Sequence, residues 1–172
     1  MIVRPARPVD AVPIGRVHVA AWRSAYAGIL PETALHRLSV PRQAAQYGAA
    51  IRARRGVFVA EAGRQVVGFC TVGRARNRFA DGEVETLYVL DDWRDHGFGR
   101  ALMQIGAERL RREEGARSLM LWVLRDNPGR WFYQRLGGRP AAEGWTEVSG
   151  TAVPQVAYVW DRIETLGPAS TV

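Results

Sequence analysis

The stretch from Val84 to Met103, V-E-T-L-Y-V-L-D-D-W-R-D-H-G-F-G-R-A-L-M, runs from a strand through a glycine-bearing turn directly into a helix. Its first part has apolar and β-branched residues at the density of a strand, and apolar residues recur at helical spacing after the glycines. Such a junction directs unpaired backbone N–H groups and the positive end of a helix toward one point, an arrangement that binds a pyrophosphate. Gly97 and Gly99 carry no side chain to hold phosphates away, and Arg94 and Arg100 add positive charge.

Two common phosphate-binding motifs do not fit this turn. A P-loop needs G-x-x-x-x-G-K-S/T, and all 24 basic residues of this chain are arginine, which excludes a Walker site. A dinucleotide fingerprint reads G-x-G-x-x-G, but its third glycine position is Leu102 here, and no acidic strand end follows at the expected distance.

A second block of sequence follows the turn at a characteristic separation. The apolar run 119–123 predicts a buried strand, and it is followed by Asp126-Asn127-Pro128 and by W-F-Y-Q-R-L-G over 131–137. Together with Arg94-Asp95-His96-Gly97-Phe98-Gly99, this order of blocks resembles the GNAT family of N-acetyltransferases, whose first motif is a glutamine or arginine followed by two paired glycines opening a helix. The resemblance covers about 57–161.

The pattern of elements along the chain agrees with the fold that this resemblance implies, a mixed α/β sheet splayed at a cofactor cleft and flanked by helices. We expect one domain over 1–172, with acceptor-side helices at about 10–55, an acetyl-CoA-binding core at about 57–137 and C-terminal strands at about 138–162. The expected helices run from Asp10 (as N-cap) to about Gly28, from Ser39 (as N-cap) to Arg54, from the glycine turn to about Gly115, and over 128–136. A short second helix, opened by 29–32 and containing Leu35 and Leu38, is expected between the first two. The expected strands span 57–61, 65–72, 83–89, 118–123, 139–148 and 153–161, with a frayed tail from about Glu164.

Composition fits one ordinary globular domain. The 172 residues are 47% hydrophobic, which is enough to form a core. The single cysteine, Cys70, lies in an apolar run and is expected to be a small buried group, and no metal site is expected. The apolar runs are too short to span a bilayer and the first residues do not resemble a signal peptide, so the sequence predicts a cytoplasmic protein without a membrane partner.

The formal net charge of +7 raises nucleic-acid binding as a rival function. The arginines are dispersed, however, and no zinc-finger or RNA-binding signature accompanies them. A basic nucleic-acid-binding module therefore ranks third, behind an enzyme and behind a non-catalytic acyl-CoA-binding or sensor protein of the same fold.

The family resemblance also implies the residues that bind acetyl-CoA. Backbone groups of Leu87 and Val89 are expected to pair with the pantetheine arm as a further strand would. The N–H groups of the turn are expected to hold the pyrophosphate, and Asn127 reaches the cofactor from the other side of the cleft. The expected cofactor-binding set is Leu87, Val89, Arg94, Asp95, His96, Gly97, Phe98, Gly99, Arg100, Ala101 and Asn127.

Acyl transfer to an amine needs a base for the amine and a proton for the departing thiolate. Glu83 and Glu85 are both candidates for the base, and alternation along a strand predicts that they share a face with Leu87 and Val89. His96 has a suitable pKa but lies in the phosphate loop, and we expect no catalytic role for it. The resemblance implies that Tyr133 lies near the thioester sulfur and protonates the leaving group.

The acceptor is expected to bind beside the first helix. Trp22 and Tyr26, four residues apart, share one helix face, where they serve as a pocket wall or as core packing. Trp145 is a candidate for the opposite wall, and His18 and His36 are expected to line the pocket or to be exposed. The acceptor class is a small-molecule amine or a peptide N-terminus, and the oligomeric state, including a homodimer, is left open by the sequence.

Overall fold

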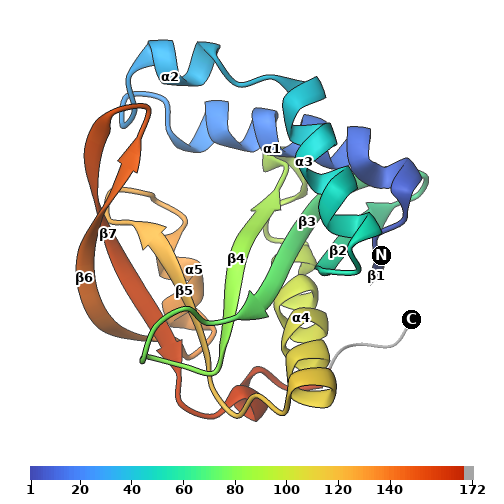
Figure 1. The fold of residues 1–172 in the computed structure, drawn as a ribbon, viewed down its shortest axis with the longest axis vertical. Helices are drawn as coiled ribbons and strands as arrows, with labels where there is room; N and C mark the ends of the chain where they lie inside the picture. Colours follow the sequence, from blue (N-terminus) through green and yellow to red (C-terminus); the bar gives the residue numbers. More distant parts are fainter. Residues whose placement is uncertain (169–172) are drawn as a thin grey trace.

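The computed structural model describes residues 1–168, whose strands form one mixed sheet (Figure 1). The strands are β1 (Ile2–Pro5), β2 (Gly56–Ala62), β3 (Gln65–Arg74), β4 (Gly82–Val89), β5 (Leu119–Leu124), β6 (Arg139–Val148) and β7 (Thr151–Trp160). Their order in the sheet is β1-β2-β3-β4-β5-β7-β6. Neighbouring strands are antiparallel except β4 and β5, which run parallel because α4 and its loops connect them.

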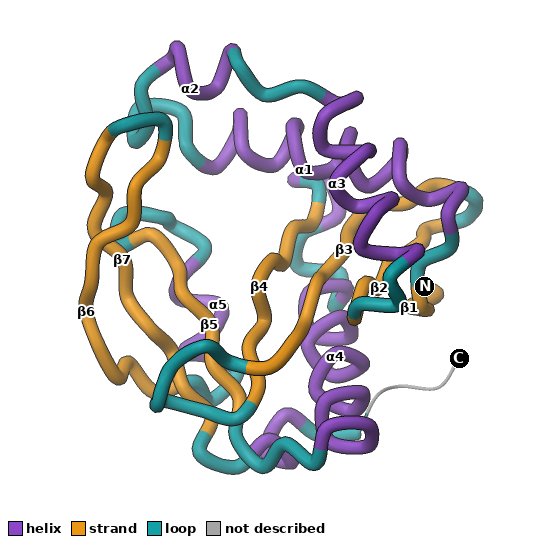
Figure 2. Tube along the Cα trace, in the orientation of Figure 1, coloured by secondary structure: helices purple, strands orange, loops and turns teal. Residues whose placement is uncertain are grey.

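Helices cover both faces of this sheet (Figure 2). They are α1 (Ala11–Ala25), α2 (Glu32–His36), α3 (Val40–Arg52), α4 (Phe98–Glu114) and α5 (Arg130–Arg135), with short 3-10 turns η1 (Pro8–Asp10), η2 (Asp91–Trp93) and η3 (Ile163–Leu166). Residues of α1 and α3 pack with β2 and β3 in one buried cluster, and residues of α4 pack with the opposite face in another. The expected mixed sheet flanked by helices is therefore confirmed.

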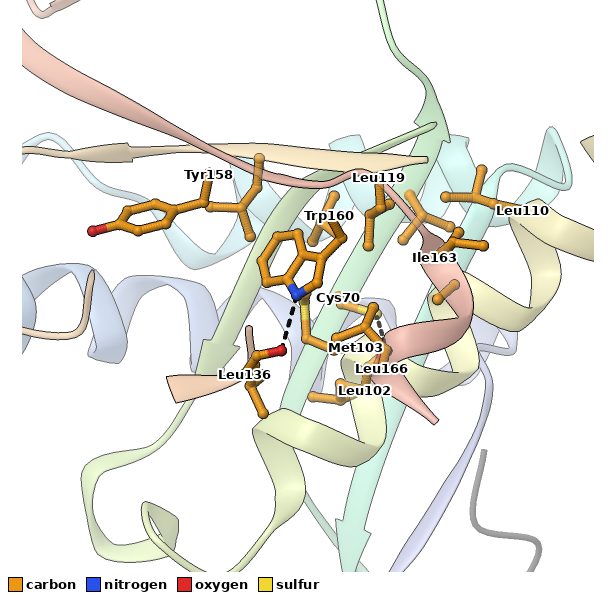
Figure 3. Packing of buried hydrophobic residues seen from close by; sticks show 14 of the residues in the cluster. Cys70, Leu102, Met103, Leu110, Leu119, Leu136, Tyr158, Trp160, Ile163 and Leu166 are labelled. Atoms are coloured by element: carbon orange, nitrogen blue, oxygen red, sulfur yellow. Dashed lines mark hydrogen bonds between the residues drawn. The ribbon is translucent and has the colours of Figure 1, made fainter. Parts of the chain in front are cut away.

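The packing of α4 shows why this helix is a fixed support for the turn at its start. Leu102, Met103 and Leu110 are fully buried, and they contact the side of the sheet that carries Trp160 (Figure 3). Burying a side chain of this size stabilises the fold by about 1.5–3 kcal/mol. The indole Nε1 of Trp160 donates a hydrogen bond of 2.9 Å to the carbonyl of Leu136, which links β7 to the end of α5.

Several element boundaries differ from the sequence prediction. Asp10 precedes α1 as predicted, but its carboxylate does not cap that helix, because it accepts hydrogen bonds from Arg4 and from the N–H of Arg7. The first helix ends at Ala25 rather than near Gly28, and α5 is shorter than the predicted helix 128–136. Ser39 does cap its helix, accepting a hydrogen bond from the N–H of Arg42 at 3.4 Å.

The two ends of the chain also depart from expectation. β1 was not predicted, and it forms because its residues pair with β2 at the edge of the sheet, a contact that no local pattern encodes. The segment after Asp161 is not frayed where it is described, because Ile163 and Leu166 are buried against α4 and the carbonyl of Leu166 accepts a hydrogen bond from Gln104. The rest of the predicted tail, 169–172, lies outside the described residues.

Candidate active site

A cleft opens where β4 and β5 separate. The two strands pair only at Gly82 with Leu119 and at Glu83 with Met120, and beyond this point they diverge (Figure 1). The cavity between them has a volume of about 630 Å³. Its walls come from β4, β5, the C-terminal part of α1, the start of α4, α5 and the ends of β6 and β7 near their hairpin.

A β-bulge interrupts β4 along the wall of this cleft. Thr71 of β3 pairs with Thr86, but the next residue, Val72, pairs with Val84, so one residue of β4, Glu85, has no partner on β3. Val84 and Leu87 both pack against α4 although they are three residues apart, which shows that the alternation of side chains breaks between them. The prediction that Glu83 and Glu85 share a face with Leu87 and Val89 is therefore wrong, because it assumed an unbroken strand.

The two glutamates have different surroundings. Glu85 lines the cleft, and its Oε1 lies 3.8 Å from a guanidinium nitrogen of the exposed Arg76. Glu83 is half-buried and is not among the residues that line the cleft. Burial raises the pKa of the Glu83 carboxyl, the charge of Glu85 adds to the rise, and the N–H of Arg76 opposes it.

The turn before α4 has the free N–H groups that the sequence predicts. None of the backbone N–H groups of 95–100 is hydrogen-bonded to another group within residues 1–168. Gly97 has a φ of +83°, a left-handed conformation that favours glycine, and Asp95 has a φ of +61°. A ready set of donors for an anion therefore lies at the start of a long helix.

The predicted loop residues divide into three groups. Arg94, Asp95 and Gly99 line the cleft, as do Leu87 and Val89 of β4. The side chains of His96 and Arg100 are exposed outside it, with Nδ1 of His96 bonded to the carbonyl of Arg94 at 2.7 Å. Phe98 and Ala101 are buried in the core and hold the helix start in place.

Asn127 and Tyr133 occupy the opposite wall. The Asn127 Oδ1 accepts a hydrogen bond from the N–H of Gly129 at 2.8 Å, and its Nδ2 donates to the hydroxyl of Tyr26 at 3.3 Å. Tyr133 lines the cleft, and burial raises the pKa of its phenol, with Tyr26 adding to the rise. Phe132 also lines the cleft, where a Cβ on Gly99 would lie 3.0 Å from its Cζ.

The two aromatic residues of α1 line the cleft and pack against each other. The rings of Trp22 and Tyr26 meet edge to face with centroids 4.9 Å apart. Tyr26 is 5% exposed and belongs to a buried cluster, so the two alternatives left by the sequence are both true of it. His18 is buried beside Trp22, with its ring stacked at 5.4 Å, and is not part of the cleft lining, so the expectation that it lines the pocket or is exposed is wrong.

Some predictions for the acceptor side fail, and some lining residues were missed. Trp145 is 69% exposed and does not line the cleft, because it lies on the outer side of β6. His36 is exposed, which is one of the two alternatives that the sequence left open, and it lies at a separate surface depression between α1 and α2. The sequence pattern gave no signal for Trp93, Trp122, Arg135, Thr146, Glu147, Val148 or Gln155, which line the cleft because distant segments of the chain meet there.

The described residues contain neither a membrane-spanning helix nor a metal-binding cluster. No helix in 1–168 has the length and hydropathy needed to cross a membrane. No cluster of three or more His, Cys, Asp or Glu side chains in the same range is arranged to hold a metal ion. The buried thiol of Cys70 lies in the core with its pKa raised by burial.

Comparisons with known proteins agree on one family. Residues 53–137 match the "Acetyltransferase (GNAT) domain" family. The chain is 34% identical over 167 residues to the "Uncharacterized N-acetyltransferase YuaI" of Bacillus subtilis (strain 168), and the match covers 95% of each chain. It is 26% identical over 164 residues to the "Probable N-acetyltransferase Rv2775" of Mycobacterium tuberculosis (strain ATCC 25618 / H37Rv), and that match covers 91% of each chain. Among solved structures, it resembles PaiA N-acetyltransferase from Thermoplasma acidophilum in complex with coenzyme A, with a TM-score of 0.69 at 20% identity over 90% of this chain and 96% of that one. It also resembles yncA from Salmonella typhimurium with its cofactor acetyl-CoA, with a TM-score of 0.70 at 20% identity over 95% and 94% of the two chains.

Proposed function

Since this chain belongs to the GNAT family of acetyltransferases, we propose that it transfers the acetyl group of acetyl-CoA to a primary amine by direct attack within a ternary complex. The observation that carries the proposal is the cleft between β4 and β5, which has free N–H donors at one end and a carboxylate and a phenol on its walls. A small-molecule amine or a peptide N-terminus is the proposed acceptor.

The residues present fit a CoA thioester. The free N–H groups of 95–100 suit the pyrophosphate, and the absence of a side chain at Gly97 and Gly99 lets phosphates approach the backbone. Beyond Glu83 the edge of β4 that faces β5 has no strand partner, so backbone groups near Leu87 and Val89 are available to the pantetheine arm. The thioester supplies an activated acetyl group when it is bound.

Two cleft residues are assigned to proton transfer. Glu85 accepts, through a water molecule, the proton that the amine nitrogen loses as its bond to the acetyl carbon forms. Tyr133 donates its phenolic proton to the sulfur as the carbon–sulfur bond breaks, and its phenol, whose pKa is raised by burial, is protonated at neutral pH. We assign the base to Glu85 rather than Glu83 because only Glu85 lines the cleft.

The acceptor is proposed to bind between α1 and the ends of β6 and β7. Trp22 and Tyr26 form one wall, and Thr146, Glu147 and Gln155 form the other. The hydrogen bond from Asn127 to Tyr26 joins the acceptor wall to the cofactor wall, so both substrates meet against one connected set of side chains.

Replacement of the carboxylates tests this assignment. Glu85→Gln should lower kcat roughly 10²-fold or more, because a neutral amide cannot accept the proton, while the affinity for acetyl-CoA stays nearly unchanged. Glu83→Gln should lower kcat less, and His96→Gln is the matched control, since His96 lies outside the cleft. Thiol release gives kcat, and calorimetry gives the affinity for the cofactor. A larger loss for His96→Gln or Glu83→Gln than for Glu85→Gln would show that the base is assigned wrongly.

A further inference from the structure

The hydroxyl of Tyr26 is held inside the cleft by a hydrogen bond to the opposite wall. Tyr26 lies at the end of α1, and Nδ2 of Asn127, which follows β5, donates a hydrogen bond to its oxygen at 3.3 Å. Both residues line the cleft, and Tyr26 is 5% exposed. The hydroxyl therefore lies between the two walls rather than at the protein surface.

The orientation of the Asn127 amide fixes the direction of this hydrogen bond. Its Oδ1 accepts a hydrogen bond from the N–H of Gly129 at 2.8 Å, so Nδ2 is the atom that faces Tyr26. A Cβ on Gly129 would lie 3.0 Å from this Oδ1, so the glycine lets the amide lie close to the backbone. An amide nitrogen donates hydrogen bonds and does not accept them, so the Tyr26 oxygen is the hydrogen-bond acceptor in this contact.

The proton of the Tyr26 hydroxyl is left for another partner. A phenol that accepts a hydrogen bond still has its own O–H to donate, and no carbonyl, carboxylate or amide oxygen within residues 1–168 accepts one from Tyr26. The phenol of Tyr88 lies close to it, but two hydroxyls that bond to each other use one of their two protons and leave the other free. Burial raises the pKa of Tyr26, so its hydroxyl is protonated at neutral pH.

A second donor in the same part of the cleft also has no oxygen to bind. The ring of Trp22 meets that of Tyr26 edge to face with centroids 4.9 Å apart, and its buried Nε1 has no hydrogen-bond acceptor within the described part of the chain. Buried donors in folded proteins are nearly always paired. The two free donors therefore indicate that a bound substrate supplies an oxygen atom here.

The acetyl carbonyl of the thioester is the oxygen that fits this place. In the proposed function the pantetheine arm lies along β4 near Val89, and the sulfur lies beside Tyr133. Tyr133 belongs to the same wall as Asn127, which is the wall that the Tyr26 hydroxyl reaches. The carbonyl oxygen and the sulfur are bonded to one carbon atom, so they occupy the same part of the cleft.

We propose that the Tyr26 hydroxyl is a catalytic hydrogen-bond donor to the acetyl carbonyl oxygen, an inference that rests on the proposed function. As the bond from the amine nitrogen to the acetyl carbon forms, one electron pair of the carbon–oxygen double bond moves onto the oxygen, and it returns when the carbon–sulfur bond breaks. Tyr26 keeps its proton throughout and stabilises the negative charge while that charge is on the oxygen. The hydrogen bond from Asn127 polarises the phenol and strengthens it as a donor.

The carbonyl stretch of bound acetyl-CoA tests this contact without any amine. A hydrogen bond to the oxygen weakens the carbon–oxygen double bond, so the stretch should lie at lower frequency in the wild-type complex than in the complex of Tyr26→Phe. Isotope-edited infrared difference spectra of acetyl-CoA labelled at the acetyl carbonyl give this frequency. Tyr47→Phe is the matched control and should leave the stretch unchanged, because Tyr47 is a buried phenol outside the cleft, 2.7 Å from Nδ1 of His18.

Turnover and a second variant complete the test. Tyr26→Phe should lower kcat roughly 10²-fold, as expected for the loss of one donor to a developing oxyanion. The affinity for CoA, which has no acetyl group, should be the same in this variant and in the wild-type protein. Asn127→Asp keeps the Tyr26 hydroxyl but offers its proton a carboxylate oxygen, so it should shift the carbonyl stretch in the same direction even if Tyr26→Phe fails to fold.

The outcomes separate this inference from the proposed function. A carbonyl stretch that is unshifted in Tyr26→Phe and in Asn127→Asp, or that is shifted by Tyr88→Phe and not by Tyr26→Phe, would overturn the inference while the proposed function stands. Absence of amine-dependent thiol release by the wild-type protein would instead refute the proposed function, and with it the catalytic role of Tyr26, whatever the spectra show.

Discussion

The buried imidazole of His18 makes the stability of this protein depend on pH in a window that can be calculated. His18 is 8% exposed, stacks on Trp22 and Phe69, and has the tilted ring of Tyr88 beside it. Burial lowers its pKa from 6.5 to about 4 in the folded protein. At about 1.4 kcal/mol for each pH unit, that difference corresponds to about 3 kcal/mol of unfolding free energy.

The direction of this pH dependence follows from whether the folded or the unfolded state binds the proton of His18. Between pH 6.5 and about 4 the unfolded chain protonates His18 and the folded protein does not, so this contribution is fully present above pH 6.5 and is lost as the pH falls to about 4. At pH 5 the loss from His18 alone should be about 2 kcal/mol. The lowered pKa values of Asp10 and Asp81 act at more acidic pH.

Urea unfolding followed by tryptophan fluorescence at pH 7.5 and pH 5.0 measures this effect. His18→Asn replaces the imidazole by a side chain that does not titrate, so its unfolding free energy should fall about 2 kcal/mol less between the two pH values than that of the wild-type protein. Contributions of the carboxylates are common to both proteins and cancel in this comparison. Equal pH dependence of the two proteins would refute the argument that burial holds His18 neutral.

Two further predictions concern the cofactor side of the cleft. Gly99→Val should weaken the affinity for CoA at least tenfold, because a Cβ there lies 3.0 Å from Cζ of Phe132 and the branched side chain intrudes beside the N–H donors. Gly115→Ala, at the other end of α4 where φ is +68° and space is open, is the control, and it should lose stability without losing affinity for CoA. If calorimetry gave Gly99→Val and the wild-type protein equal affinities for CoA, the phosphate-loop assignment would be contradicted. Tyr133→Phe removes only the hydroxyl and should slow the chemical step in single-turnover experiments roughly 10²-fold with the cofactor affinity little altered. An unchanged single-turnover rate would mean that Tyr133 only packs against the cofactor.

Local patterns were enough to predict most of the fold and the half of the cleft that we propose binds the phosphates. The start of α4 was predictable because its glycines, its arginines and the helical spacing of its apolar residues all lie within one continuous segment. The hairpin of β2 and β3 was predictable because Gly63, with a φ of +61°, joins two apolar strands. Both features are set by residues that are close together in the sequence, so a local pattern is enough to predict them.

Features that depend on distant neighbours were not predictable. The β4 bulge exists only in the register between Thr71 and Thr86, so a count along β4 alone assigned Glu83 and Glu85 to the wrong face. β1 requires pairing with β2, which is more than fifty residues away in the sequence. The wall of the cleft that we propose binds the acceptor includes residues of β6 and β7, which carry no motif and meet α1 only in the folded sheet.

We propose that this chain catalyses acetyl transfer from acetyl-CoA to an amine. The most direct test follows thiol release from acetyl-CoA by the purified protein, with and without polyamines, aminoglycosides, amino acids and peptides with free N-termini, and identifies the product by mass spectrometry. We predict that at least one amine accelerates thiol release well above the rate without an acceptor, with one acetylated amine formed for each thiol released and with the activity lost in Glu85→Gln. Binding of acetyl-CoA with no amine-dependent thiol release across the whole panel would contradict the claim and would favour a protein that binds acyl-CoA without catalysis.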